Sequence, residues 1–277
     1  MAVPILADRA ETFAANRARG EIALSVASSG GVTRRRHVGE AGSLRVRFPG
    51  PRAADLQAVL VNTAGGIAGG DHFAIDIAVG KAARLAVTSA AAEKVYRSLG
   101  PDAAVHLKLK VQAGGDLTWL PQETILFDRA RLRRTIDVDL AGSATLVLAE
   151  ALVFGRAAMG ETVRQGSVFD RWRVRRGGKL VFAETMRLDG EIDATLRQPA
   201  VAAGGAAVAT LLIVPGDEAR VAAVRAVLQP HGEAALSAWN GLAVARFIAG
   251  DSAALRHDLT AVLAALGVAL PRLWLNS

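Results

Sequence analysis

The chain has 277 residues, of which 51% are hydrophobic and 21% charged, and its formal net charge is +7. This composition is typical of a globular protein with a large core and excludes an intrinsically disordered chain. The sequence contains no cysteine, which excludes disulfides and thiolate metal ligands. Asp8, Arg9 and Glu11 interrupt any signal peptide, and the longest apolar stretch, 200–214, is too short to span a membrane. We therefore expect a soluble cytoplasmic protein with no membrane partner.

Apolar residues alternate with polar ones in many short segments between about residues 20 and 200, and this period of two predicts strands. The clearest segments are 44–48, 105–111 and 136–140, and a short helical turn is expected within 90–96. Glycines at 80, 114–115, 142 and 177–178 separate the segments and indicate turns. The pattern favours a large all-β body.

The pattern changes after about residue 205. Residues 208–214 and 242–248 read as strands, whereas Asp217 and Asp251 are N-caps for helices that extend to Leu228 and to about Leu266. The predicted fold is therefore mainly β. It has a multi-stranded body, β-helix-like or sandwich-like, over residues 1–205. A small α/β region with two helices, 206–277, either packs on this body or continues it.

The segment 62–71 reads N-T-A-G-G-I-A-G-G-D and holds four glycines within six residues. Its G-G-x-x-G-G spacing differs from that of a phosphate loop or a dinucleotide fingerprint. A carboxylate, Asp71, follows the glycines and would repel an anion, and a strand follows where those motifs have a helix. The simplest interpretation is a tight, bulged turn between two strands.

Three carboxylates share a strand face with large apolar residues: Asp71, Glu150 and Glu184. Asp and Glu are rarely buried unless they are paired or liganded. One explanation is that each pairs with an arginine, or that a bulge turns it outward. The other is that these carboxylates line a polar interior that serves a hard or borderline cation.

The arginines cluster at 34–36, 129–134 and 171–176, and solvent, an acidic protein partner or nucleic acid would each fit such a surface. A low aromatic content of 5% and the lack of any known binding motif count against nucleic acid. A basic β protein that binds a polyanion or nucleic acid is the alternative function. The five histidines form no close metal-binding motif, and no serine or cysteine nucleophile motif is present. We expect no enzymatic activity and no catalytic residue, and a carboxylate-based hydrolase ranks third.

Four motifs follow in order, namely N-T-A-G-G-I-A-G-G-D at 62–71, A-E-K-V-Y-R-S at 92–98, L-P-Q-E-T-I-L-F at 120–127 and F-G-R-A-A-M-G-E at 154–161. With the closing P-R-L-W at 271–274, the chain resembles the urease accessory protein family UreD, also called UreH, from about residue 20 onward. Thr63-Ala64 departs from the family, which more often has two prolines before the glycines.

The resemblance implies a largely β, non-enzymatic protein. It implies binding to apo-urease and assembly with a UreF-type accessory protein and a UreG-type GTPase, which together deliver nickel to the urease active site. The resemblance also implies an internal passage for the ion, so we expect Ni²⁺ to bind only transiently and no cofactor to be bound tightly. Asp71, Glu150 and Glu161 match family positions and are the expected passage residues, and Glu184 joins them on strand parity. The C-terminal helices are candidate docking faces for the UreF-type partner.

Overall fold

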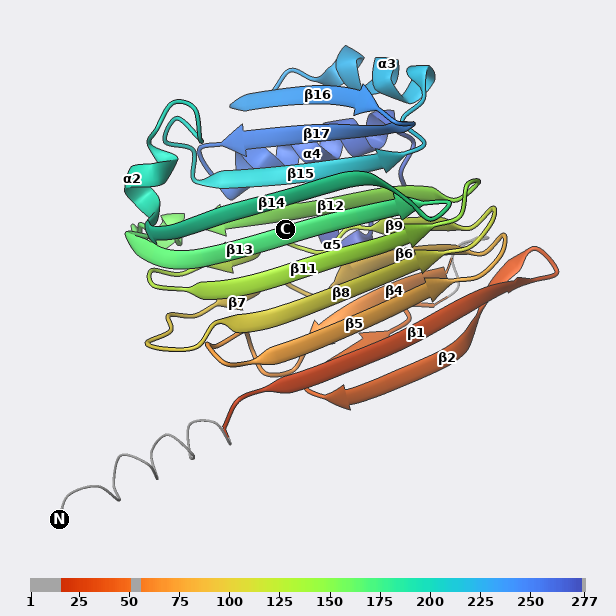
Figure 1. Ribbon diagram of the computed structural model, residues 1–277, viewed down its shortest axis with the longest axis horizontal. Helices are drawn as coiled ribbons and strands as arrows, with labels where there is room; N and C mark the ends of the chain where they lie inside the picture. The colour runs from red at the N-terminus through yellow and green to blue at the C-terminus, as the bar shows by residue number, and fades with distance from the viewer. Residues whose placement is uncertain (1–15, 51–55, 276–277) are drawn as a thin grey trace.

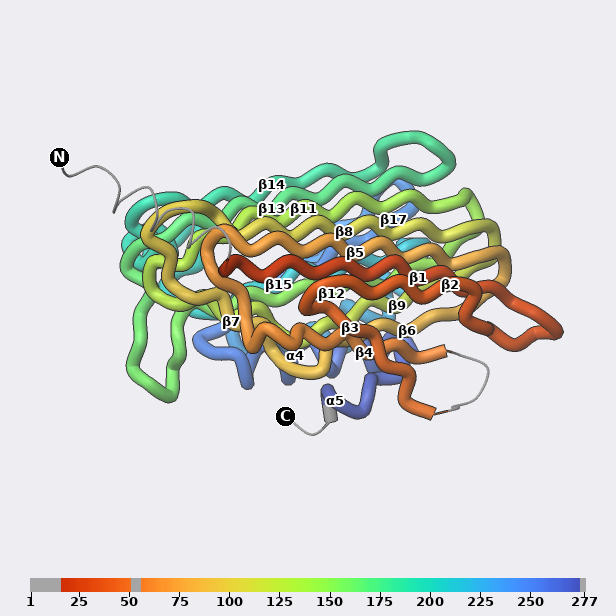
Figure 2. Tube along the Cα trace, turned by 90° about the horizontal axis from the view of Figure 1, so that it is seen from below, coloured from red at the N-terminus to blue at the C-terminus, as the bar shows by residue number. Residues whose placement is uncertain are grey.

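The computed structural model describes residues 16–50 and 56–275. Within these residues the strands form two sheets that lie face to face (Figures 1 and 2). The prediction of a mainly β fold is confirmed. Asp8, Arg9 and Glu11, on which the signal-peptide argument rests, lie outside the described residues. None of the described helices is long and apolar enough to cross a membrane.

The first sheet has seven strands in the described residues, in the order β14-β13-β11-β8-β5-β1-β2. Their bounds are β1 Arg19–Ser29, β2 Val32–Gly42, β5 His72–Val79, β8 Ala103–Val111, β11 Arg131–Leu140, β13 Gln165–Arg176 and β14 Lys179–Glu191. The strands β1, β5, β8, β11 and β13 run parallel, whereas β2 and β14 are antiparallel edges.

The second sheet has the order β16-β17-β15-β12-β9-β6-β4-β3, and the short strands β7 and β10 join it beside β12. Among its described strands, β4, β6, β9 and β12 run parallel. The bounds are β3 Leu44–Arg47, β4 Leu56–Asn62, β6 Arg84–Ser89, β7 Glu93–Val95, β9 Asp116–Trp119, β10 Thr124–Leu126, β12 Thr145–Phe154, β15 Ala207–Val214, β16 Glu233–Trp239 and β17 Leu242–Ala249.

From β4 to β13 the chain alternates between the two sheets, as in a β-solenoid, so each coil adds one parallel strand to each sheet. All connections from the second sheet to the first therefore lie at one end, which we call the motif end, and they comprise residues 63–71, 96–102, 127–130 and 155–164. The return connections lie at the other end, which we call the glycine-turn end, and they comprise 80–83, 112–115 and 141–144, beside hairpins such as 177–178. Figure 2 shows the two ends at the left and the right.

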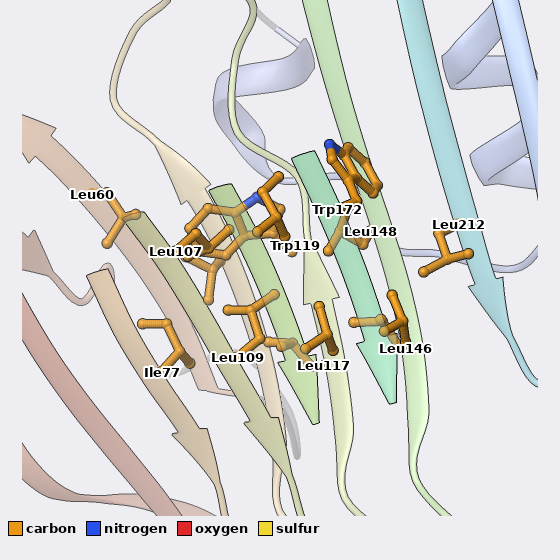
Figure 3. Close-up of a cluster of buried hydrophobic side chains, with 14 of the residues drawn as sticks. Leu60, Ile77, Leu107, Leu109, Leu117, Trp119, Leu146, Leu148, Trp172 and Leu212 are labelled. Carbon is orange, nitrogen blue, oxygen red and sulfur yellow. The ribbon is translucent and has the colours of Figure 1, made fainter. Parts of the chain in front are cut away.

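The main core lies between the inner faces of the two sheets, where side chains of alternate residues meet (Figure 3). A second apolar cluster lies on the outer face of β12, β15 and β17 and is covered by helices. The helical segments are a 3₁₀ turn Ala157–Met159, α2 Ile192–Leu196, α3 Glu218–Val227, α4 Ser252–Ala265 and α5 Arg272–Leu275.

The C-terminal elements follow the predicted pattern. Asp217 accepts a hydrogen bond from the Arg220 N–H at 2.9 Å, and Asp251 accepts one from the Ala254 N–H at 2.9 Å, so both are N-caps. The strand β15 pairs with β12, so the region 206–277 extends the second sheet of the body. Strand β16 was not predicted because its polar and small residues hide its alternation.

The expected helical turn within 90–96 is wrong. Residues 93–95 form β7, which pairs in parallel with β10. The three-residue strand is too short to show a period in the sequence, and its pairing partner lies 31 residues away, from Glu93 to Thr124. Tertiary pairing therefore decides the conformation here.

Candidate functional site

A charged cluster crosses the core between the two sheets. From the first sheet, Arg134 extends its guanidinium toward Glu150 of the second sheet, and its Nη1 forms an ion pair with the Glu150 carboxylate. Its Nε donates to Asp170 Oδ1 at 3.0 Å and its Nη2 to Asp170 Oδ2 at 2.6 Å. Trp119 Nε1 donates to the other Glu150 oxygen at 2.8 Å. Every charge in the cluster thus has a partner.

The strand period explains how the cluster reaches the core. Each charged residue stands between two buried apolar neighbours on its own strand, as Arg134 does between Leu132 and Ile136. Arg134, Glu150 and Asp170 are 6–8% exposed. Glu150 was predicted at core-side parity, and the structure confirms its burial.

Burial and mutual attraction compete in this cluster. Burial lowers the pKa of Arg134, but the carboxylates of Asp170 and Glu150 outweigh it, and the net direction is upward. Burial also raises the pKa of Glu150, against the opposing attraction of Arg134. The net direction for the pKa of Glu150 is upward, because burial outweighs the attraction of Arg134.

Two cavities flank the cluster, and Arg134 and Glu150 line both. The larger has a volume of about 100 Å³ and reaches Asn62, Glu93 and Gln122 near the motif end. The smaller has a volume of about 40 Å³ and reaches Asp170 and Glu184. Since a water molecule needs only about 10–15 Å³ of such volume, each cavity has room for water or a small ion. The paired side chains of Arg134 and Glu150 separate the two spaces.

Glu184 lies where the smaller cavity approaches the surface. Its carboxylate forms an ion pair with Arg246 Nη2 of β17. The side chain of Glu184 is 28% exposed and that of Arg246 is 48% exposed, so solvent reaches this pair far more than it reaches the Arg134 cluster. The structure thus brings Glu150 and Glu184 to one cavity, as strand parity suggested.

Asp71 is buried, as predicted, but it lies in the glycine segment and lines neither cavity. Its two oxygens accept hydrogen bonds from the backbone N–H groups of Ala18, at 2.8 Å, and Ala68, at 2.7 Å. Two donors on one carboxylate fix the end of the glycine segment against the start of β1. Its role as a nickel-passage residue stays a prediction.

The glycine segment connects β4 of one sheet to β5 of the other, so it is a crossover and not a hairpin turn. A Cβ on Gly69 would lie 1.9 Å from Ser98 Oγ and 2.6 Å from the Pro101 carbonyl oxygen. Gly66 has φ +142° and faces the Tyr96 ring in the same way. Glycine is required because neighbouring connections press against this backbone.

Glu161 lies in the 155–164 connection, away from the buried cluster. It accepts from Arg156 Nε at 2.6 Å and from the Asp128 N–H at 3.3 Å. The hydrogen bond from Arg156 lowers the pKa of Glu161. Glu161 and Arg156 line an open groove of about 960 Å³ that runs from this connection to α2 and the start of α4.

The motif segments, far apart in sequence, contact one another at the motif end. Tyr96 Oη donates to the Gly65 carbonyl at 2.8 Å, and the Tyr96 ring meets the Phe127 ring edge-on at 5.2 Å. The Arg156 guanidinium lies 4.1 Å from the centre of the Phe127 ring. Two large apolar side chains project outward here, Leu99 at 90% and Met159 at 70% exposure. Exposed apolar groups on ordered loops are typical of a protein-binding surface.

The closing motif 271–274 packs on the motif 120–127. Trp274 Nε1 donates to the Leu120 carbonyl at 3.0 Å, and Gln122 Nε2 donates to the Leu273 carbonyl at 3.0 Å. Arg256 Nη2 of α4 donates to Glu123 Oε2 at 2.6 Å. The C-terminal helices are therefore fixed to the body through the motif residues.

No group of three or more His, Asp or Glu side chains within 16–50 and 56–275 has the spacing of a closed metal site. Strand parity identifies Glu150 and Glu184 in the sequence, whereas Arg134 and Asp170, the two side chains that complete the cluster, were not predicted. The same signal was present, because each is a charged residue flanked on its own strand face by apolar ones, Asp170 by Val168 and Trp172.

Comparisons with known proteins agree over nearly the whole chain. The model of the UreD urease accessory protein family matches residues 18–275. A "Urease accessory protein UreD" of Rhodopseudomonas palustris strain BisA53 is 60% identical over 265 residues, 95% of this chain and 93% of that protein. "Urease accessory protein UreD 3" of Bradyrhizobium sp. strain BTAi1 is 58% identical over 269 residues, 96% and 97% of the two chains. The R. palustris strain BisB18 protein is 58% identical over 275 residues, 99% of both chains.

Proposed function

Because the chain belongs to the UreD family of urease accessory proteins, we propose that it is a maturation factor for urease. It binds apo-urease and, with a UreF-type accessory protein and a UreG-type GTPase, enables the insertion of nickel into the urease active site. The observation that carries this proposal is the family match across residues 18–275. The protein itself acts without catalysis. This division of labour agrees with the glycine segment, which is a crossover between sheets and does not open a helix as a phosphate loop does.

The interior supplies a route for the ion in this proposal. Nickel as cargo moves from one cavity to the other past Glu150, with Glu93 on the side of the larger cavity and Glu184 on the side of the smaller one. Arg134 closes the route in the present state, because its guanidinium occupies the space between Glu150 and Asp170 and repels another cation. Transfer requires Arg134 to turn away while the ion takes over its carboxylate partners.

Loose coordination suits a carrier of this kind. A closed cage of four ligands would hold the ion too tightly for release, whereas carboxylates met one after another allow entry and exit. Each position offers oxygen ligands, which suit hard and borderline divalent ions. Asp71 and Glu161 lie outside the two cavities, so a role for them in the route requires that the motif end rearranges when a partner binds.

The motif end is the docking face for apo-urease in this proposal. It carries the exposed Leu99 and Met159 and the 960 Å³ groove. The larger cavity lies behind it, so an ion leaving past Glu93 would reach a protein bound there. The exposed faces of α3 and α4 are the docking surface for the UreF-type partner.

The first test is complementation in a urease-positive host that lacks this gene. We expect inactive, nickel-poor urease in the deletion strain, and restored activity and nickel content when the gene returns. Fully active, nickel-loaded urease in the deletion strain would contradict the maturation role.

A second test separates the route from the family role. Glu150→Gln keeps the shape of the side chain and its hydrogen-bond acceptor for Trp119 but removes the charge, and we expect it to lower urease activity and nickel content. Asp76→Asn, an exposed change on the outer face of β5, is the matched control and should activate urease normally. If Glu150→Gln also activates normally while the deletion does not, the route is wrong and the maturation role stands.

A further inference from the structure

Two histidines and a carboxylate meet on the C-terminal region. His231 lies between α3 and β16, and His257 and Asp258 lie on α4. The two imidazole rings are 4.5 Å apart between centroids. Both rings are exposed, whereas Asp258 is only 6% exposed. None of these residues belongs to the cluster around Arg134 or to the motif end.

Asp258 fixes the orientation and the tautomer of His231. Its Oδ1 lies 2.7 Å from His231 Nδ1, and its Oδ2 accepts from the His231 backbone N–H at 3.0 Å. An ionised carboxylate only accepts hydrogen bonds, so Nδ1 carries the proton and Nε2 keeps its lone pair. A buried carboxylate on one ring nitrogen is the usual support of a metal-binding histidine, whose other nitrogen binds the ion.

The spacing of the rings suits a shared ion. A metal about 2.1 Å from one nitrogen of each ring requires ring centroids about 4 to 5.5 Å apart. The observed 4.5 Å lies within this range. His257 is exposed on its helix, so its ring can flip about χ2 and direct a nitrogen toward the ion while the ring centroid stays nearly in place.

The chain offers a second histidine pair for comparison. His72 and His106 lie 5.1 Å apart between centroids on the outer face of the first sheet. His106 Nδ1 bonds the Thr135 hydroxyl at 2.9 Å and has no carboxylate in that place. Partial burial, followed by the neighbouring charges of His72, Lys108 and Arg171, lowers the pKa of His106, so this surface disfavours a cation.

We propose that His231 and His257 form a surface site for a borderline divalent cation such as Ni²⁺ or Zn²⁺. Asp258 orients His231, and water or a bound protein completes the coordination. Two protein ligands hold an ion more weakly than three or four do and therefore release it more readily. The proposal needs neither the interior route nor urease binding, because its readout is metal retained by the isolated chain.

Equilibrium dialysis of the purified full chain against NiCl₂ tests the proposal. We expect the wild-type chain to retain about one ion, and His257→Ala to weaken retention about 10-fold or more because one ligand is lost. His106→Ala is the matched control and should bind as the wild type does. Retention unchanged in His257→Ala, or lost in His106→Ala, would overturn the proposal.

Asp258→Asn tests the orienting role. We expect it to weaken Ni²⁺ retention about 10-fold while both histidines remain. Far-UV circular dichroism verifies that the variant is folded, and His231→Gln provides an independent variant at an exposed position if it is not. Retention that is unaffected in folded Asp258→Asn and in His231→Gln would show that this cluster holds no ion.

Discussion

The two ends of the molecule are built on the same strands but differ in almost every other respect. At the glycine-turn end the chain reverses between sheets in short connections such as 80–83 and 141–144. At the motif end most connections are longer and carry motif residues, and the Tyr96 side chain contacts both Gly65 and Phe127 of neighbouring connections. Regular strands supply the scaffold, and most of the long, irregular connections between the two sheets lie at the motif end.

The core behind the two ends differs in the same way. Toward the glycine-turn end it is apolar, with Leu109, Leu117 and Leu146 side by side (Figure 3). Nearer the motif end the facing positions hold Arg134 and Glu150, with cavities on both sides. A protein selected for stability alone would continue the apolar packing, because a buried ion cluster stabilises less than well-packed apolar groups. The polar half is thus the half expected to function.

The largest expected effect comes from removing Arg134. Arg134→Met leaves Glu150 and Asp170 buried without their cation, so we expect the free energy of unfolding to fall by about 3–5 kcal/mol. Urea denaturation followed by circular dichroism measures it. Arg133→Met, one residue away on the outer face, should change stability by about 0.5 kcal/mol or less, since its 3.7 Å ion pair with Asp102 is long and partly exposed.

The triple variant Arg134→Met, Glu150→Leu, Asp170→Leu sharpens the comparison. It removes all three charges together, so we expect it to recover most of the lost stability, whereas urease activation should be lost because Glu150 is gone. If Arg134→Met is as stable as the wild type, the cluster is not a tightly paired buried network.

The second-largest expected effect is on stability, and it compares one glycine from each end of the molecule. Gly69→Ala at the motif end places a Cβ against the Pro101 carbonyl and should cost about 1–3 kcal/mol of the free energy of unfolding. Gly142→Ala at the glycine-turn end meets no heavy atom within 4 Å and should change stability by about 1 kcal/mol or less. Thermal denaturation of both variants measures the difference. Equal stabilities would show that the connections at the motif end are not closely packed.

The fold could be predicted from the sequence where local physics determines it. Strand alternation, the glycine turns and the aspartate caps of α3 and α4 are all local signals, and the structure has them where they were expected. The alternation between sheets could not be predicted, because it depends on the pairing of strands such as β8 with β11, whose contacts are distant in sequence. Strand β7 was missed for the same reason.

The candidate site was predictable only in part. The alternation of side chains along a strand placed Glu150 and Glu184 on inner faces. It does not show which strand of the other sheet faces them. The ion pair between Arg134 and Glu150 joins two sheets, so it follows from the stacking of the sheets and not from either segment alone. The resemblance to a known family identified the motifs in the sequence. Their meeting at one end of the molecule could not be predicted, because it follows from the parallel coils, which place every connection from the second sheet to the first at the same end.

The third effect concerns exposed apolar side chains at each end. The double change Leu99→Ser, Met159→Ser should weaken binding to apo-urease about 10-fold or more, because central apolar contacts dominate the energy of protein interfaces. The unfolding transition should stay unchanged, since both side chains are largely exposed. Leu180→Ser, 53% exposed beside the glycine-turn end, is the control and should leave binding intact. Apo-urease that binds the double variant as tightly as the wild type would place the docking face elsewhere.

The smallest expected effect is the contribution of Glu93 to the pH dependence of the free energy of unfolding. Burial raises the pKa of Glu93, although the hydrogen bond from Asn62 opposes this. The folded protein therefore holds this proton more tightly than the unfolded chain does. The stabilising contribution is full below the unfolded pKa, about 4.5, and is lost as the pH rises through the raised, folded value.

Glu93→Gln removes this ionisation but keeps an acceptor for Asn62. We expect it to be more stable than the wild type by up to about 1 kcal/mol at pH 8 and to lose that advantage near pH 4.5. Urea denaturation at several pH values measures the trend. Asp139→Asn, exposed near the glycine-turn end, should follow the wild type within about 0.5 kcal/mol at each pH. A Glu93→Gln curve parallel to the wild type would mean that the carboxyl group of Glu93 titrates as in water. Water would then reach Glu93 through the larger cavity, and the interior near the motif end would not be a closed, poorly hydrated space.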